Sequence, residues 1–284
     1  LATVYCGGCQ GEESTPFVIL PIRKEISIEN SKMTLNFDED SGFLKSLTKK
    51  SDGDSIPLEI KFGAYKSVIG FSGAYLFKTA SSDAKMSERD IFEGVEEKKL
   101  IITSGPIASD VTVIRGSLLA HTIRLYKTET HLDSAIMIDN EVQLVNPIDG
   151  WETEMFMRFN TSIDNGEDFF TDLNGFQWQP RKKVQRIGPE GNYYPITTSA
   201  FIQDRQKRLT LMTTHARGAT SLEKGQLEVM LDRLTRVDDR RGMAQGVFDN
   251  DLTLHRFWLT MEFFDSESNE NSYHVPSFLA QHLS

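Results

Sequence analysis

Segments in which polar and apolar residues alternate recur along most of the chain, and this pattern constrains the fold more than any other feature. Residues 32–37 alternate in this way, residues 38–42 are a polar turn, and residues 43–47 return to the pattern. A period of two is typical of a β-strand with one buried face, whereas a helix repeats every 3.6 residues. The same pattern returns at residues 99–102, 110–115, 118–126, 131–145, 154–160, 197–203, 209–214, 226–231 and 254–264. The sequence therefore predicts an all-β protein, built as a large antiparallel β-sandwich.

Helical periodicity is weak, and only residues 86–92 are expected to form a short helix. Residues 1–24 are rich in Gly, Glu and Ser at their centre, which disfavours regular structure. We predict that they form a connector or the edge of a preceding module, with residues 18–20 as an edge strand. Residues 25–284 are then one β-sandwich domain. The first residue is Leu1 rather than Met, so we expect a piece of a longer protein.

Charge and composition limit the possible partners. The net charge is −10, which argues against nucleic acid, because phosphates require a basic face. Hydrophobic residues make up 39% of the chain and include 18 Phe, enough for a substantial core. No apolar run approaches the roughly 20 residues of a membrane-spanning helix. The tripeptide Asn160-Thr161-Ser162 is a glycosylation sequon, which agrees with a secretory-pathway lumen.

The sequence offers no complete metal site. Cys6 and Cys9 form one C-x-x-C pair, which is half of a zinc ribbon and favours a local disulfide or two free thiols. His131 and Asp133 would share one face of a strand, but zinc needs three or four convergent ligands. We therefore interpret His131-Leu132-Asp133 as a polar strand face and predict that this chain binds no metal.

Two segments combine aromatic, small and polar residues in a way that suits a sugar. In residues 71–77, Gly73 permits close approach, and Tyr75 could stack on a sugar or donate its hydroxyl, although a core aromatic is an equal alternative. In residues 169–181, aromatic residues alternate with Asp, Asn and Gln around a strong turn, and the alternative is an amphipathic hairpin.

The stretch from Glu228 to Asn250 is the third candidate. An apolar run ends in Asp232-Arg233, and a turn with further charges and glycines follows, including Asp239 and Arg241. A plain hairpin needs only one pair of turn residues, so this loop suits a polar partner better than simple chain reversal. On a strand, neighbouring side chains such as Asp232 and Arg233 point to opposite faces. The alternative is a solvated charged turn.

Several of these motifs, in order and spacing, resemble the C-terminal β domains of the class II α-mannosidases, glycoside hydrolase family 38. The resemblance extends from about residue 26 to 264, and the Phe-Thr-Asp-Leu-Asn-Gly-Phe form is closer to the Golgi α-mannosidase II branch. It rests on Ser72-Gly-Ala-Tyr-Leu-Phe77, Phe169-Phe-Thr-Asp-Leu-Asn-Gly175, Asn192-Tyr-Tyr-Pro-Ile-Thr-Thr198, Arg208-Leu-Thr-Leu211, Arg217-Gly-Ala-Thr-Ser-Leu-Glu-Lys-Gly-Gln226 and the stretch from Leu231 to Asn250.

The resemblance implies a galactose-mutarotase-like supersandwich that belongs to a larger enzyme. In this family an N-terminal barrel carries the zinc ligands, the Asp nucleophile and the acid, and their His-x-Asp-Pro-Gly-Trp type of motif is absent from the sequence. By motif position, Tyr75, Asp232 and Arg233 would line the edge of the sugar pocket, with Asp239 and Arg241 shaping the loop. One departure is Leu234, where the family usually has a second Arg; Arg236 is a candidate substitute.

We therefore expect the C-terminal domain of a zinc-dependent retaining α-mannosidase that acts on the α-mannosyl linkages of N-glycans. The expected partners are the glycan, the N-terminal catalytic domain of the same chain and, as a further candidate, a second copy in a homodimer. The expected location is the lumen of the Golgi, with the lysosome as the alternative. Two other hypotheses are a stand-alone carbohydrate-binding or aldose-mutarotase-like module, and a domain of an inactive paralogue, which Leu234 favours.

Overall fold

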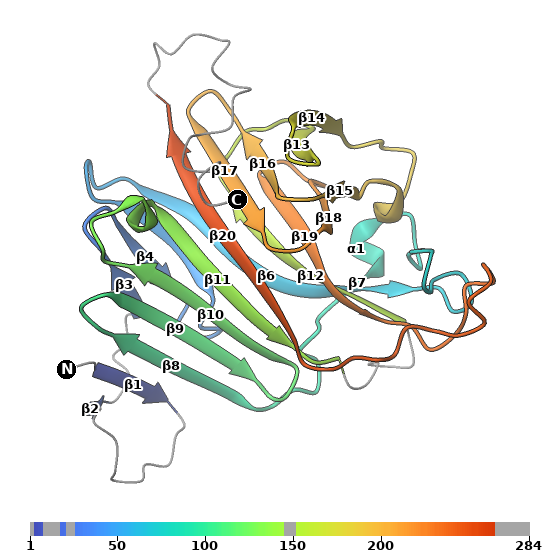
Figure 1. Ribbon diagram of the computed structural model, residues 1–284, viewed down its shortest axis with the longest axis horizontal. Coiled ribbons are helices and arrows are strands. Elements are labelled where there is room, and N and C mark those ends of the chain that lie inside the picture. Colours follow the sequence, from blue (N-terminus) through green and yellow to red (C-terminus); the bar gives the residue numbers. More distant parts are fainter. Residues whose placement is uncertain (1–2, 8–17, 21–25, 145–151, 265–284) are drawn as a thin grey trace.

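The computed structural model describes residues 3–7, 18–20, 26–144 and 152–264, and side chains are described in the last two ranges. These residues form two large sheets that face each other, with short helical turns in the connections (Figure 1). Apart from the parallel β1–β2 pair, the ladders between neighbouring strands are antiparallel. The predicted all-β antiparallel sandwich is confirmed.

The larger sheet has eleven strands within the described residues. The last of these strands in sequence, β20, lies near the middle of the sheet, between β17 and β11. In spatial order the strands are β14 (Gln177–Lys182), β13 (Asp168–Leu173), β16 (Ser199–Gln203), β17 (Lys207–Thr213), β20 (Thr253–Phe263), β11 (Ala135–Val142), β10 (Leu119–Tyr126), β9 (Ala108–Arg115), β8 (Lys98–Ser104), β1 (Thr3–Gly7) and β2 (Val18–Leu20).

The smaller sheet is built around β12 (Glu152–Thr161), which pairs with β19 (Gln226–Leu234) and with the long strand β6 (Ser55–Ser67). On one side of this centre lie β15 (Tyr194–Ile196) and β18 (Arg217–Thr220), and on the other lie β5 (Leu44–Lys49), β4 (Met33–Phe37) and β3 (Ile26–Glu29). The two-residue strand β7 (Glu88–Arg89) pairs with the end of β6. The central strands therefore carry residues far apart in sequence to one end of the sandwich.

The period-two pattern of the sequence is the pattern of burial in the structure. In β10 every second residue is buried, and β4 alternates in the same way. Apolar side chains from both sheets form one core, which includes Leu35, Leu58 and Phe159 of the smaller sheet and Ile123 and Leu259 of the larger one. Burying such side chains stabilises the fold by about 1.5–3 kcal/mol each. The core leaves the ends of the sandwich to the loops.

The helical turns differ from the sequence predictions. The expected helix at 86–92 is instead α1 (Ala84–Ser87), capped by the Asp83 carboxylate, and the chain then enters β7. The described ranges also contain the 3₁₀ turns η1 (His131–Ser134) and η3 (Pro189–Gly191). Residues 131–134 are therefore not strand, because Thr130 caps the turn and the strand β11 starts only at residue 135.

The first residues take part in the larger sheet. Thr3–Gly7, which we expected to be irregular, forms β1 and pairs with β8. The predicted edge strand Val18–Leu20 is β2, and it pairs in parallel with β1. The state of the Cys6–Cys9 pair involves a residue outside the described ranges, and the domain boundary near residue 24 stays a prediction.

Candidate functional site

Two loops meet at one end of the sandwich. The first follows β6 and contains Tyr75, and the second joins β19 to β20 and contains Asp239; both lie at the right of Figure 1. A Cβ added at Gly73 would lie 2.8 Å from the backbone N of Asp239. The loops can therefore touch at this point because residue 73 has no side chain.

Hydrogen bonds fix the first loop to the second loop and to β19. The Asp239 carboxylate accepts from the backbone N–H groups of Tyr75 and Leu76, at 2.7 and 2.8 Å. The Arg233 Nη2 donates to the carbonyl of Leu76 at 2.8 Å and to the Glu154 carboxylate at 2.5 Å. The backbone at residues 75 and 76 is thus held on both its donor and its acceptor side. We call these four contacts the Leu76 clamp.

Burial makes the charges of the clamp depend on one another. Asp239 is 3% exposed, and although burial opposes its ionisation, the N–H groups it accepts hold its pKa below the usual value. Glu154 is 4% exposed, and burial raises its pKa to about 7 against the opposing effect of Arg233. A buried carboxylate of this kind retains its charge only through its partner.

The Tyr75 side chain projects from the clamp into solvent. It is 63% exposed, and its hydroxyl has no hydrogen-bond partner among residues 26–144 and 152–264. The alternative of a core aromatic is wrong, because the core begins at the neighbouring Tyr65 and Phe77 side chains. An exposed phenol on a fixed backbone can stack on an apolar face and donate one hydrogen bond.

Asp232 and Arg233 point in different directions, as expected for neighbours on a strand. Asp232 accepts from the Asn250 amide at 3.4 Å and from the backbone N–H of Arg233, and burial raises its pKa. Arg217, which donates to the carbonyl of Leu231 at 3.1 Å, provides the nearby positive charge. Asp232 therefore ties the end of the second loop to β19 instead of joining the Leu76 clamp.

Three further residues named in the sequence analysis lie in or beside the second loop. Arg241 is exposed, and it gives the site only its backbone N–H, which donates to Asp239 at 3.2 Å. Leu234 is 5% exposed within the core, so this position faces inward and not toward the loops. The backbone N–H of Arg236 donates to the buried Glu152 carboxylate at 2.8 Å. The structure brings Tyr75, Arg233 and Asp239 together and leaves the Arg241 side chain outside the cluster.

A buried polar network in the smaller sheet was not foreseen from the sequence. The Glu228 carboxylate, 1% exposed, accepts from the hydroxyls of Tyr65 and Tyr193 and from the Arg158 guanidinium. Arg158 also makes a bidentate pair with Glu88 at 2.9 Å. Burial raises the pKa of Glu228 and of both tyrosines. A signal was available, since Arg158 and Glu228 interrupt apolar strands at positions that should be polar only on an exposed face.

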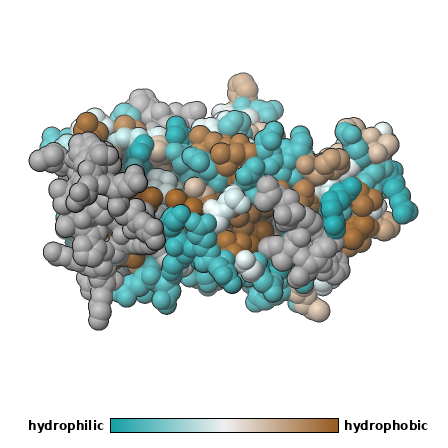
Figure 2. Space-filling view, turned by 90° about the horizontal axis from the view of Figure 1, so that it is seen from below, coloured by the Kyte–Doolittle hydropathy of each residue, from teal (hydrophilic) through white to brown (hydrophobic). Residues whose placement is uncertain are grey.

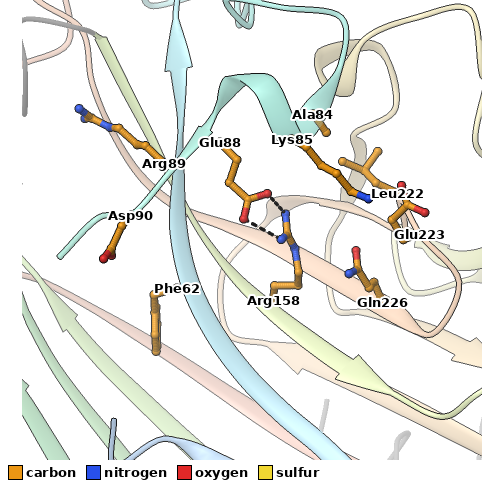
Figure 3. A pocket seen from close by; sticks show the side chains of 10 residues that line it. All are labelled: Phe62, Ala84, Lys85, Glu88, Arg89, Asp90, Arg158, Leu222, Glu223 and Gln226. Atoms are coloured by element: carbon orange, nitrogen blue, oxygen red, sulfur yellow. Dashed lines mark hydrogen bonds and ion pairs between the residues drawn. The ribbon is translucent and has the colours of Figure 1, made fainter. Parts of the chain in front are cut away.

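A pocket of about 500 Å³ opens beside this network (Figure 3). Its wall contains the Glu88–Arg158 pair, with the side chains of Phe62, Lys85 and Gln226 around it. Two of the charges in this lining, Glu88 and Arg158, are already paired with each other. This arrangement differs from the loop site, where the exposed group is an aromatic ring.

The other sequence candidates have structural roles. Asp133 is 1% exposed and accepts from the backbone N–H groups of Thr128 and Glu129, so it closes a turn and does not share a strand face with His131. Within the described ranges, no group of three His, Cys, Asp or Glu side chains is placed to hold a metal ion. Nor do these ranges contain a helix of the length and hydropathy needed to cross a membrane.

The aromatic stretch at 169–181 is the hairpin β13–β14. Positive φ angles at Asn174 and Gly175 form its turn, and Phe176 is 93% exposed. The Asp172 carboxylate accepts from the backbone N–H of Gly175 and from the three consecutive N–H groups of residues 197–199, where β16 begins. The Asp-Leu-Asn-Gly motif thus fixes a turn to its neighbouring segment.

The sequon residue Asn160 lies on the central strand β12. Its side-chain amide oxygen is buried, and its Nδ2 donates to Glu59 at 3.0 Å. A glycan on this nitrogen would replace that contact, so the position adds no support for a lumenal location.

Comparisons with known proteins agree with the motifs. Residues 28–241 match the model of the glycosyl hydrolases family 38 C-terminal domain. Alpha-mannosidase 2 of Spodoptera frugiperda is 37% identical over 99% of the chain, and alpha-mannosidase 2 of Homo sapiens is 33% identical over 90%. The chain spans only 28% and 22% of these relatives.

Among solved structures, a glycosyl hydrolase family 38 protein from Enterococcus faecalis has the same fold. It matches with a TM-score of 0.58 and 13% identity over 84% of this chain and 30% of its own. The family model and the relatives cover most of the chain in sequence, and the bacterial structure reproduces the sandwich. The chain therefore belongs to glycosyl hydrolase family 38, in which it matches the C-terminal domain.

Proposed function

We propose that this chain is the C-terminal domain of an α-mannosidase that cleaves α-mannosyl linkages of N-glycans, and that it contributes one wall of the sugar site through Tyr75 and Arg233. The observation that carries the proposal is the convergence of two loops from distant parts of the sequence. Asp239 and Arg233 hold the backbone beside Tyr75, whose hydroxyl and ring face solvent. Sugar sites need such pairings of an aromatic face with fixed polar groups.

In this proposal the bond-breaking groups belong to the rest of the longer chain. A retaining glycosidase uses one carboxylate to attack the anomeric carbon and one carboxylic acid to protonate the leaving oxygen, after which water releases the sugar. Among the described residues no group of three His, Cys, Asp or Glu side chains is placed to hold a metal ion, and the proposal assigns the zinc ligands to the N-terminal part of the longer chain. The domain would orient the substrate: Tyr75 donates a hydrogen bond to it, and the Leu76 clamp keeps that donor in place.

The proposed partners follow from the size of the relatives. Because the chain spans about a quarter of their length, the N-terminal part of the same chain is its first expected partner, and a second copy in a homodimer is a further one. The proposed location is the Golgi lumen, with the lysosome as the alternative.

The test is hydrolysis of a chromogenic α-mannoside with added zinc, with this 284-residue chain and the full-length enzyme measured side by side. We expect turnover only from the full-length enzyme. In that enzyme, Arg233→Ala and Tyr75→Phe should each lower kcat/KM by about tenfold or more, the loss expected when a positioned contact to the transition state is removed. Turnover by the 284-residue chain, or unchanged kinetics in both variants, would refute the proposal.

A further inference from the structure

We propose that Glu154 is a positioning residue for this sugar site: through Arg233 it fixes the carbonyl of Leu76 and so determines where Tyr75 is presented. This inference rests on the proposed function and assigns a role within it to a buried residue that touches no substrate. Glu154 lies on the central strand β12, directly opposite Arg233 on β19 and opposite Tyr65 on β6. It is anchored in the sheet on both sides.

The contacts connect the buried sheet to the exposed loop through one intermediate side chain, that of Arg233. The Glu154 side chain is 5% exposed, whereas the Arg233 side chain is 27% exposed and Tyr75 is 63% exposed. Arg233 Nη2 bonds both the Glu154 carboxylate and the Leu76 carbonyl. The position of the guanidinium is therefore set by a rigid strand, and the loop carbonyl is set by the guanidinium.

The second loop cannot replace this contact. In the first loop, Asp239 accepts from the N–H groups of residues 75 and 76 and has no contact with the Leu76 carbonyl, and it belongs to a loop rather than to a strand. Without Glu154, the Arg233 guanidinium is left near the Asp239 carboxylate. This carboxylate would draw it away from the Leu76 carbonyl. Loss of the buried carboxylate should therefore release one side of the clamp and leave the other side intact.

The first measurement is amide hydrogen exchange over residues 71–78 in the full-length enzyme. We expect Glu154→Gln to raise exchange at the Tyr75 and Leu76 amides by about tenfold or more. These amides still donate to Asp239, but they exchange when the loop opens, and opening no longer has to break the charge-assisted hydrogen bond from Arg233 to the Leu76 carbonyl. The matched control is Glu59→Gln, which changes a carboxylate on the neighbouring strand β6 that accepts from Asn160. The control should leave exchange at residues 71–78 unchanged.

The second measurement is steady-state kinetics on the same variants. Glu154→Gln should lower kcat/KM about tenfold, since a small displacement of a positioned contact has effects of this size or larger. Glu154→Asp, which keeps the charge, should recover part of both the exchange protection and the activity. If Glu154→Gln does not fold, Arg233→Lys serves instead, because lysine lacks the planar guanidinium whose Nη2 contacts both acceptors.

The outcomes separate the two proposals. If residues 71–78 of the Glu154→Gln variant exchange at the same rate as in the parent, the positioning role is overturned, whatever the activity. Faster exchange without loss of activity would also overturn it if Tyr75→Phe lowers activity. If Tyr75→Phe, Arg233→Ala and Glu154→Gln all leave activity unchanged, the proposed function itself fails.

Discussion

At the scale of single residues, several ionisable groups that water normally solvates are buried in the sandwich, and each is stabilised there by hydrogen bonds to a partner. The charged network around Glu228 joins four side chains from strands β6, β12 and β7 and from the loop before β15. His121 is held differently: it lies between aromatic rings with one hydrogen bond, to Asn140 at 2.6 Å. These groups make stability sensitive to charge and to pH in ways that can be measured.

Replacing Arg158 by Ala should destabilise the fold by about 3–5 kcal/mol, because it leaves the Glu228 carboxylate buried without its cation. The control is Arg256→Ala, which breaks the bidentate pair with Asp139 at a position where the Arg256 side chain is 42% exposed. An exposed pair contributes about 0–1 kcal/mol. Denaturant unfolding of both variants measures the difference, and equal losses would contradict this view of the network.

His121 should make the protein less stable in acid. Burial lowers its pKa to about 4, while the unfolded chain retains a value near 6.5. Between these values the folded state binds fewer protons than the unfolded state. The contribution of His121 to the free energy of unfolding is therefore fully present above about pH 6.5 and is lost as the pH falls toward 4. The expected loss at about pH 5 is about 2 kcal/mol.

Denaturant unfolding at about pH 7.5 and about pH 5 tests this, with His121→Gln as the matched variant. The variant should have a shallower pH dependence than the parent. His255, whose pKa burial lowers to about 3, contributes in the same direction and remains in both proteins. Identical pH slopes would show that His121 is not the group responsible.

At the scale of elements, alternation in the sequence was sufficient to predict most strands, because burial on one face is a property of each strand alone. β4 and β10 lie within predicted segments, and β9 and β20 begin two residues and one residue before theirs. Residues 131–134 were assigned wrongly because the deciding feature is a cap: Thr130 begins a 3₁₀ turn, and Asp133 accepts from the N–H groups of residues 128 and 129. Polar residues in a cap and on a strand face look alike in a sequence.

The candidate site could be predicted only in part. Motif resemblance selected Tyr75, Arg233 and Asp239, which the fold brings together. It could not select Glu154, because its importance comes from register: β12 places it opposite Arg233, and the pairing of two distant strands has no local signature. Motif resemblance also selected Arg241 as a residue that shapes the loop, but the structure shows only its backbone N–H in contact with Asp239.

The approach of the two loops should depend on Gly73. A Cβ there would lie 2.8 Å from the backbone N of Asp239 and 2.9 Å from its Cβ, so Gly73→Ala must push the loops apart. We expect kcat/KM of the full-length enzyme to fall about tenfold, with thermal stability nearly unchanged, since the contact lies outside the core. Gly105→Ala is the control, because the nearest atom to its added Cβ is 3.4 Å away. Equal kinetics in the two variants would argue against the contact.

At the scale of the whole molecule, large apolar side chains are exposed at the end where the two loops meet. Hydrophobic and hydrophilic residues lie together at the right-hand end of the molecule in Figure 2. The exposed large apolar side chains of the two loops are Ile69, Phe71, Tyr75, Val237, Met243, Phe248 and Leu252. Grouped apolar exposure of this kind is typical of a surface that another part of a protein covers. The relatives are several times longer than this chain, so we expect the remainder of a longer chain to cover this surface.

We therefore expect residues 68–76 and 237–252 to exchange their amide hydrogens more slowly in the full-length enzyme than in the 284-residue chain. The reference is the β13–β14 turn, which lies at an edge of the larger sheet and in which Phe176 is 93% exposed. Its exchange should be the same in both proteins. Faster or equal exchange at both loops in the longer chain would mean that the remainder of the enzyme packs elsewhere.

The place of β20 has a consequence for how the chain is made. This strand is the last of the described strands in sequence, yet it joins β17 to β11 in the middle of the larger sheet. While a ribosome is still synthesising residues before 253, the sheet can exist only as two halves, each with an unpaired edge that is open to wrong partners. The sandwich is completed by one late event, so a chain that stops before Thr253 loses the centre of its sheet and not merely its margin.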